Sequence, residues 1–318
     1  MINRNLLRIK IIQVLYSYYK NNKEENDFSL AQEELLYSID KTYELYHYFF
    51  QLILMVTEMA EKRFGKKSCG MEESELCRKL AKNRFAAQLA QNLSLKRYLM
   101  EKGEEAEDWF SDESNVVNEV FRLVLSSDVL AEYAQKRETT YNDDKELWRG
   151  IVRRVIPECE LLGKELEDVS IYWNDDADIV LSFVGKTIRQ FEESAGAGYP
   201  LLPKFKDEED EKFAISLFKN AIYNANDYKE LIVKHTQNWE ADRIAFLDTL
   251  IMQTALAEIC SFPSIPVSVS MNEYLDLAKY YSTPRSSNFI NGVLDAIVKE
   301  LQEQKKITKV AYINNYKK

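Results

Sequence analysis

Apolar residues recur along this chain at the spacing of α-helices. In residues 3–22, Leu6, Ile9, Ile12 and Tyr16 stand three or four positions apart, so they share one face of a helix. The 318 residues include only 9 Gly and 6 Pro, too few turn residues for a doubly wound α/β sheet or a β-sandwich. We therefore predict an all-α fold. The same period predicts further helices over residues 27–63, 72–102, 114–136, 143–168, 175–193, 213–235, 242–261 and 289–301.

Turn-forming residues interrupt this pattern in the second half of the chain. Residues 194–211 collect Gly, Pro and acidic residues and are typical of a linker. Pro263 and Pro266 interrupt the helical pattern further along the chain. Ser270 and Glu273 have the S-x-x-E spacing of a capping box, which predicts that a helix begins there.

The charge of the chain is unevenly distributed. The net charge is −10, yet residues 1–23 hold five basic residues and no acid. Residues 213–318 are nearly balanced, so residues 24–212 carry a net charge of −16. An acidic bulk repels polyanions, whereas a basic end can still bind them locally.

The residues that common enzymes depend on are scarce. The chain has two histidines, and GxGxxG, GxxxxGK[ST], HExxH and GxSxG motifs are all missing. Its four cysteines form no CxxC pair, which disfavours a zinc site or a disulfide framework. We therefore expect no metal, no cofactor and no enzymatic activity. Because no run of 18 apolar residues and no signal peptide is found, we expect a cytoplasmic protein outside the membrane.

One C-terminal segment carries a specific resemblance. From Ser264 to Ile297 the chain reads SIPVSVSMNEYLDLAKYYSTPRSSNFINGVLDAI. Pro266 stands near its start, the pair Asn272–Glu273 opens a helical run, and residues 289–295 read FINGVLD. This order resembles the NusB family of transcription antitermination factors, in which a proline-led segment, an asparagine–glutamate pair and an FVNGVLD helix follow one another.

The N-terminal helix carries the second part of the resemblance. The family begins with a basic helix of the pattern RR-x-x-R-x-x-x-x-QxLY. Asn5 stands where one family arginine is found, and Leu6 where a further basic residue is common, so the basic character is weaker here. The resemblance covers residues 1–22 and about 210–300. The positions that align with the pattern are Arg4, Asn5 (in place of the arginine), Arg8, Gln13, Val14, Leu15 and Tyr16.

The resemblance implies a fold of two small helical bundles and an RNA-binding factor without catalytic activity. Such proteins pair with the ribosomal protein NusE, bind boxA-type single-stranded RNA in the ribosomal leader, and act in the RNA polymerase elongation complex. Family members are less than half as long as this chain. We therefore predict a basic helix over 1–23, an acidic helical insertion over 24–209, and the remainder of the NusB-like domain with a basic tail over 210–318.

Candidate interface residues follow from these placements. Arginine and aromatic side chains can contact phosphates or stack on unpaired bases, and a polar loop over 281–288 precedes the last helix. The exposed end of the preceding central helix is the candidate contact for NusE. For each residue the alternative is a packing, capping or solvated role. The RNA candidates are Arg4, Asn5, Arg8, Lys10, Gln13, Tyr16, Arg285, Ser287, Asn288 and Phe289, and the NusE candidates are Asp242, Arg243 and Asp248.

Two other functions remain open from the sequence. Asn5, Leu6 and the acidic middle favour a helical protein-interaction scaffold with weakened RNA binding. A NusB-like domain of an RNA methyltransferase is less favoured, because no glycine-rich strand–loop–helix segment follows the helical part. Salt-dependent RNA binding would separate the antitermination factor from the scaffold.

Overall fold

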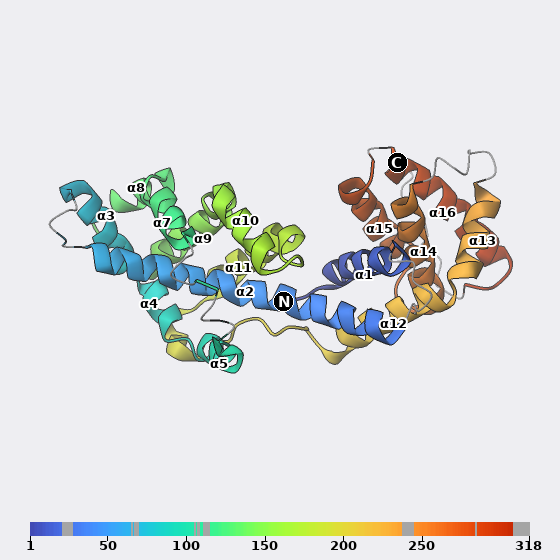
Figure 1. Ribbon diagram of the computed structural model, residues 1–318, viewed down its shortest axis with the longest axis horizontal. Helices are drawn as coiled ribbons and strands as arrows, with labels where there is room; N and C mark the ends of the chain where they lie inside the picture. The colour runs from blue at the N-terminus through green and yellow to red at the C-terminus, as the bar shows by residue number, and fades with distance from the viewer. Residues whose placement is uncertain are drawn as a thin grey trace. The chain divides into compact units, whose positions relative to one another are not determined.

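The computed structural model describes most of the chain as helix (Figure 1). Among the described residues the only extended pairing is an isolated parallel bridge between Ile2 and Phe205, so the predicted all-α fold is confirmed. No helix of this part of the chain is long and apolar enough to cross a membrane. The described residues are 1–20, 28–64, 66, 70–104, 106, 109–110, 115–236, 245–283 and 285–307, without the side chain of residue 174.

The chain forms two compact units. Unit 1 contains Met1 and Asp40–Lys204, and unit 2 contains Ile2–Ile39 and Phe205–Lys318. Our predicted insertion, 24–209, is wider than unit 1. The difference at its start arises because helix α2 (Phe28–Arg63) begins in unit 2, where the ring of Phe28 stacks on Phe218 with centroids 5.9 Å apart.

Unit 1 is built on the later part of α2 and a series of shorter helices. α9 packs extensively against both α8 and α11. Three 3₁₀ turns cover Ile156–Glu158, Asn174–Asp176 and Glu193–Gly198. The helices are α3 (Met71–Ala81), α4 (Arg84–Ala90), α5 (Leu93–Lys102), α7 (Val116–Leu125), α8 (Asp128–Ala134), α9 (Tyr141–Arg154), α10 (Glu160–Val169) and α11 (Ala177–Gln190).

Several of these helices begin inside stretches that we predicted as single helices. The side chain of Asn83 accepts a hydrogen bond from the amide of Ala86, and Asn92 does the same for Leu95, so α4 and α5 each receive an N-cap. The predicted helix over 72–102 is therefore three helices. The helical spacing of apolar residues continues through Asn83 and Asn92, so the sequence pattern gave no sign that the helix ends there.

The aromatic residues of α2 form much of the core of unit 1. Four of them are buried and therefore pack in the interior: Tyr46, Tyr48, Phe49 and Phe50. Residues 199–204, which lie inside the segment predicted as a linker, pack against α2 through hydrogen bonds. Tyr43 Oη donates to the carbonyl of Leu202 at 3.0 Å, and the amide of Leu202 donates to Tyr46 Oη at 3.2 Å. We call residues 199–204 the strap.

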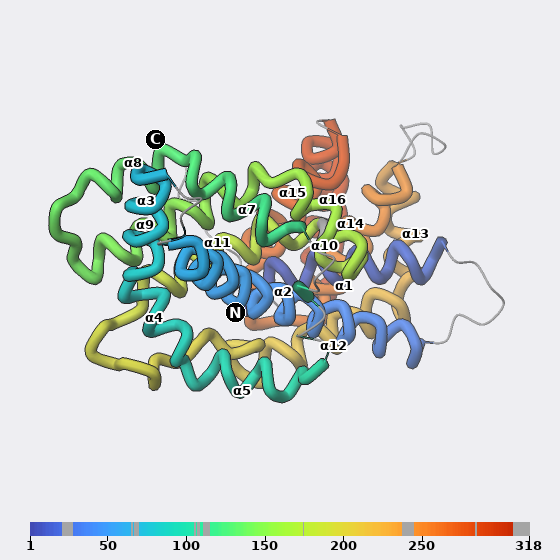
Figure 2. The backbone as a smooth tube through the Cα atoms, turned by 60° about the vertical axis from the view of Figure 1, so that its left-hand side comes forward, coloured from blue at the N-terminus to red at the C-terminus, as the bar shows by residue number. Residues whose placement is uncertain are grey.

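Unit 2 surrounds one central helix, α14, which is buried along most of its length. Figure 2 shows α14, α15 and α16 side by side. The single helix predicted over 213–235 is two helices that join at Asn224. The helices of unit 2, besides the start of α2, are α1 (Arg4–Lys20), α12 (Glu208–Tyr223), α13 (Ala225–His235), α14 (Phe246–Ser261), α15 (Val267–Tyr281) and α16 (Ser286–Glu303).

Two predicted helix starts in unit 2 are wrong. α15 begins at Val267 behind Pro266, so Ser270 and Glu273 lie inside it and form no capping box. Ser270 Oγ instead donates to Glu258 at 2.7 Å. α16 begins at Ser286, three residues before the predicted Phe289. Ser270 contacts α14, and Ser287 contacts α15. A local sequence pattern does not contain these tertiary partners.

Candidate nucleic-acid and partner interface

Arg8 is buried in an ion-pair network in unit 2. Only 3% of the residue is exposed. Its Nε and Nη2 donate to the two carboxylate oxygens of Glu258 at 2.8 and 2.9 Å, and its Nη1 donates to Glu273 at 3.1 Å. Burial alone would lower the pKa of Arg8, but the hydrogen bonds and negative charge of Glu258 outweigh burial and raise this pKa. The network joins α1, α14 and α15.

Tyr274 completes this network. Its Oη donates to Glu258 Oε2 at 3.0 Å, and burial together with the charge of Glu258 raises the pKa of Tyr274 well above its usual range. The Glu258 carboxylate thus accepts hydrogen bonds from Arg8, Ser270 and Tyr274. Each of the three guanidinium nitrogens of Arg8 thus donates to a carboxylate inside the unit, and Glu258 links α1, α14 and α15.

Lys10 is also placed inside, with 1% of the residue exposed. Arg4 is different, because 40% of its side chain is exposed. It pairs with Asp210 at 3.0 Å and lies 4.9 Å from the centroid of the Phe213 ring. Asn5 is exposed beside it. Of the predicted RNA residues in the first two turns of α1, Arg4 and Asn5 therefore face solvent, whereas Arg8 and Lys10 do not.

The other end of α1 carries an aromatic and basic cluster. Tyr16 is 43% exposed, and its ring centroid lies 5.5 Å from that of Phe246. Lys20 Nζ lies 4.7 Å from the Phe246 centroid. We call Tyr16, Lys20 and Phe246 the aromatic end. At about 1.5 Å per residue, Tyr16 is about 18 Å along the helix from Arg4.

An apolar cavity of about 220 Å³ lies next to the aromatic end. It is formed between α1, α14 and α15, and Tyr16 belongs to both features. The polar groups in its wall come from Gln13 and two tyrosines. Its lining residues are Ile9, Ile12, Gln13, Tyr16, Leu247, Ile251, Leu277 and Tyr281. Such a cavity fits an apolar side chain of a partner better than it fits a charged group.

Asp248, predicted to face a partner, is 5% exposed. Its carboxylate accepts a hydrogen bond from Ser282 Oγ, and Ser286 Oγ lies 2.9 Å from that hydroxyl. Asp248 therefore fastens the turn between α15 and α16 to the start of α14. The other two NusE candidates, Asp242 and Arg243, lie outside the described residues.

The predicted residues of the 285–289 region begin α16. Arg285 and Asn288 are exposed, and Phe289 is half-buried. Ser287 Oγ donates to the carbonyl of Leu275 at 3.3 Å, which ties it to α15. This region follows Tyr281, which shares the cavity wall with Tyr16 and Gln13. Gln13 and Tyr16 thus lie toward this end of unit 2, and Arg4 and Asn5 lie toward the other end of α1.

Sequence reasoning did not single out Phe246, Lys20 or Tyr281. Phe246 opens a helix that is apolar on every side, so no pattern marked it as exposed at that end. No signal in the sequence marked this residue.

Among the described residues, no group of three or more His, Cys, Asp or Glu side chains could hold a metal ion. The NusB family model matches residues 184–299, a range that begins within α11, includes α12 to α15 and most of α16, and leaves out α1. No solved structure matches the chain.

Curated relatives agree with this match. The chain is 39% identical over 108 residues to the transcription antitermination protein NusB of Salinibacter ruber, which covers 34% of this chain and 68% of that protein. It is 41% identical over 100 residues to the NusB of Koribacter versatilis, covering 31% of this chain and 68% of the relative. It is 39% identical over 92 residues to the NusB of Chloroherpeton thalassium, covering 29% and 44%.

Proposed function

Because this chain belongs to the NusB family, we propose that it is a transcription antitermination factor. It binds boxA-type single-stranded leader RNA of ribosomal transcripts together with NusE, within the RNA polymerase elongation complex. The observation that carries the proposal is the joint presence, in the family-matched unit, of an exposed aromatic end and an apolar cavity. We further propose that residues 24–209 are an acidic helical insertion into the family domain.

The RNA surface of this proposal is the aromatic end with Arg285 and Asn288. Single-stranded RNA is recognised by stacking of unpaired bases on aromatic or guanidinium planes, and one stacked base contributes about 1–3 kcal/mol. Tyr16 and Phe246 offer rings, while Lys20 and Arg285 offer charge to phosphates. Arg4 and Asn5 form a second, more distant contact point. Arg8 and Lys10 are left out of the surface, because both are buried.

NusE is proposed to dock on the apolar cavity. A partner side chain placed among Ile12, Leu247 and Leu277 would remove apolar surface from water, which stabilises a complex by roughly 25 cal/mol per Å². Asp248 contributes indirectly in this proposal, because it holds the neighbouring turn through Ser282. RNA and NusE would then occupy adjacent parts of one face, which allows each to strengthen the binding of the other.

The test is binding of a boxA leader RNA against a scrambled RNA, with and without NusE, across a salt series. We expect a preference for boxA that NusE strengthens, with a log–log salt slope of about −0.7 for each phosphate contact. Arg285→Ala is expected to weaken binding, whereas Lys299→Ala, an exposed cation further along the same helix, serves as the matched control. Equal affinity for both RNAs under every condition would contradict the proposal.

One observation favours a second candidate, the protein-interaction scaffold. Burial of Arg8 and Lys10 removes two cations from the predicted RNA surface. In that case NusE still binds through the cavity, Leu277→Asp abolishes its binding, and no RNA preference is seen. The same experiment therefore separates the two functions.

A further inference from the structure

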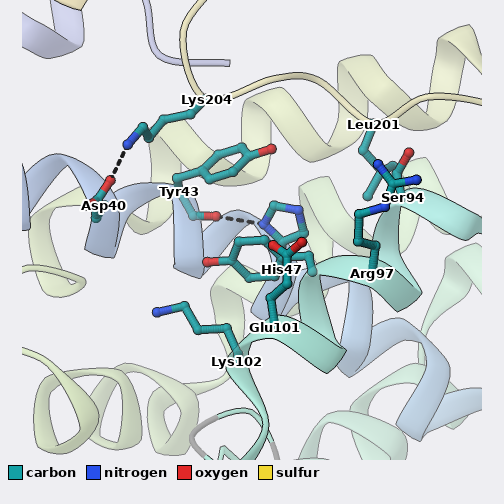
Figure 3. A pocket seen from close by; sticks show the side chains of 10 residues that line it. Asp40, Tyr43, His47, Ser94, Arg97, Glu101, Lys102, Leu201 and Lys204 are labelled. Atoms are coloured by element: carbon teal, nitrogen blue, oxygen red, sulfur yellow. Dashed lines mark hydrogen bonds and ion pairs between the residues drawn. The ribbon is translucent and has the colours of Figure 1, made fainter.

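Unit 1 contains a polar pocket that the proposed function does not use. Its volume is about 450 Å³, within the range of small-molecule sites. Figure 3 shows that α2 and α5 form its walls and that the strap also lines it, with Lys204 near Asp40 and Leu201 near Ser94. Ion pairs hold the rim: Lys204 with Asp40 at 2.6 Å, and Lys102 with Glu44 at 2.8 Å.

His47 stands in the wall of this pocket with an unused nitrogen. Its residue surface is 1% exposed, and its ring stacks on Tyr98 with centroids 3.5 Å apart. Nδ1 is 2.9 Å from the carbonyl of Tyr43, so Nδ1 carries the proton and Nε2 is an acceptor. Burial lowers the pKa of His47 to about 4, which keeps the ring neutral at physiological pH. In the described part of the chain, Nε2 has no hydrogen-bond partner.

Helix α5 brings two further groups to the pocket whose charges are not paired. Arg97 and Glu101 are both exposed, and neither forms an ion pair or hydrogen bond with the residues that the structure describes. They stand one turn apart, which places their Cβ atoms about 5–6 Å from each other. Ser94 lies beside Arg97 in Figure 3, near the N-terminus of α5. Together Arg97 and Ser94 make a place for an anion.

These three groups, none of which has a protein partner among the described residues at the atom concerned, complement the chemistry of a nucleotide. An anion fits Arg97 and Ser94, a pair of ribose hydroxyls fits a free carboxylate such as Glu101, and a base amino or imino group fits a neutral acceptor such as His47 Nε2. A simple phosphate or carboxylate would leave Glu101 and His47 unused. A sugar phosphate would leave His47 Nε2 without a donor in a wall made of aromatic rings.

We propose that this pocket binds a nucleotide, with the phosphate at Arg97 and Ser94, the ribose at Glu101 and the base edge at His47. The nucleotide is either free or part of a single-stranded RNA. The site lies in unit 1, whereas the proposed boxA surface lies in unit 2, so the inference does not depend on the proposed function.

The test is isothermal titration of the full chain with AMP, CMP, GMP and UMP, and with ribose 5-phosphate, inorganic phosphate and a short single-stranded RNA. We expect at least one nucleotide to bind, and Arg97→Ala to weaken binding by about tenfold or more, as the loss of a charged contact does. Lys96→Ala, an exposed neighbour that does not line the pocket, is the matched control and should leave affinity unchanged.

His47→Phe keeps the ring that stacks on Tyr98 but removes the acceptor, so we expect it to weaken nucleotide binding and not phosphate binding. Binding of mononucleotides identifies a free ligand, and binding of the RNA alone, with loss in Arg97→Ala, identifies a strand. The proposal is overturned if neither mononucleotides nor RNA bind at millimolar concentration, or if Arg97→Ala binds as tightly as the unmodified chain. Equal affinity for ribose 5-phosphate and nucleotides would overturn the placement of the base.

Discussion

The guanidinium of Arg8 makes two hydrogen bonds to the carboxylate of Glu258 and so joins α1 to α14 in the interior of unit 2. The Arg8 and Glu258 side chains are 4% and 0% exposed, so water cannot solvate either charge if its partner is removed. Removing one partner of such a pair leaves an uncompensated buried charge.

Arg8→Met is therefore expected to lower the free energy of unfolding of unit 2 by about 3–5 kcal/mol. Chemical denaturation of the variant measures this loss. The double variant Arg8→Met/Glu258→Gln should recover part of it, because it leaves no buried charge unpaired. Arg4→Met is the comparison variant, since 40% of the Arg4 side chain is exposed against 4% for Arg8, and it should lower stability by less than Arg8→Met does. Equal effects of Arg8→Met and Arg4→Met would contradict this account.

Gly150 is required by the packing of α9 on α8. A Cβ atom at this position would lie 2.7 Å from Val129 Cγ1. Gly150→Ala should therefore destabilise unit 1 by about 1–3 kcal/mol despite the better helix propensity of alanine. Gly163, within α10, has nothing within 4 Å of such a Cβ, so Gly163→Ala should stabilise by up to about 1 kcal/mol. Thermal unfolding should show a lower Tm for Gly150→Ala and a higher Tm for Gly163→Ala than for the unmodified chain.

His47 makes the stability of unit 1 depend on pH. Its pKa is about 4 in the folded chain, against 6.5 as the ordinary value, mainly because burial disfavours the charged ring. The unfolded chain therefore binds the proton first as pH falls. The stabilising contribution is complete above pH 6.5 and is lost between pH 6.5 and 4, a change of about 3 kcal/mol at 1.36 kcal/mol per unit.

The measurement compares urea unfolding at pH 7 and pH 4.5 for the unmodified chain and His47→Phe. Because carboxylates titrate in both proteins, the difference between the two pH responses isolates His47. We expect the variant to lose less stability on acidification, and an identical response in both proteins would refute the assignment.

Asp248 should control the mobility of the turn before α16. Asp248→Ala removes the acceptor of Ser282, a hydrogen bond to a charged group that contributes about 1.5–3 kcal/mol. We expect faster amide exchange at residues 282, 283, 285 and 286 and weaker RNA binding, with the helices of unit 1 unchanged. Asp295→Ala, on the exposed side of α16, is the comparison variant and should leave exchange in this turn as it was.

Local patterns were sufficient for the helical fold and for the central place of α14, because apolar period and turn residues act over short distances. These patterns did not predict helix ends that a single side chain determines. Asn83 and Asn92 end and restart helices inside an unbroken apolar period. At Asn224, where α12 meets α13, the side chain makes no such cap and instead donates to the carbonyl of Asn220.

The candidate interface was harder to predict than the fold. Arg4 and Arg8 share a helix face, yet Arg4 reaches solvent and Arg8 meets a carboxylate 250 positions away in the sequence. No local pattern contains that partner. The exposed cluster of Tyr16 and Phe246 is equally non-local, since it exists only once α1 lies against α14. RNA and NusE contacts at these residues stay predictions.

The composition of the strap bears on how the pocket of unit 1 keeps its shape. Pro200 and Pro203 flank Leu201 and Leu202. The carbonyl of Leu202 accepts a hydrogen bond from Tyr43, and its amide donates one to Tyr46. A proline ring fixes φ, so this segment has fewer conformations to lose on folding than an ordinary loop of the same length. The side of the pocket that the strap forms is thus ordered before any ligand arrives, and a ligand need spend little of its binding free energy on arranging it.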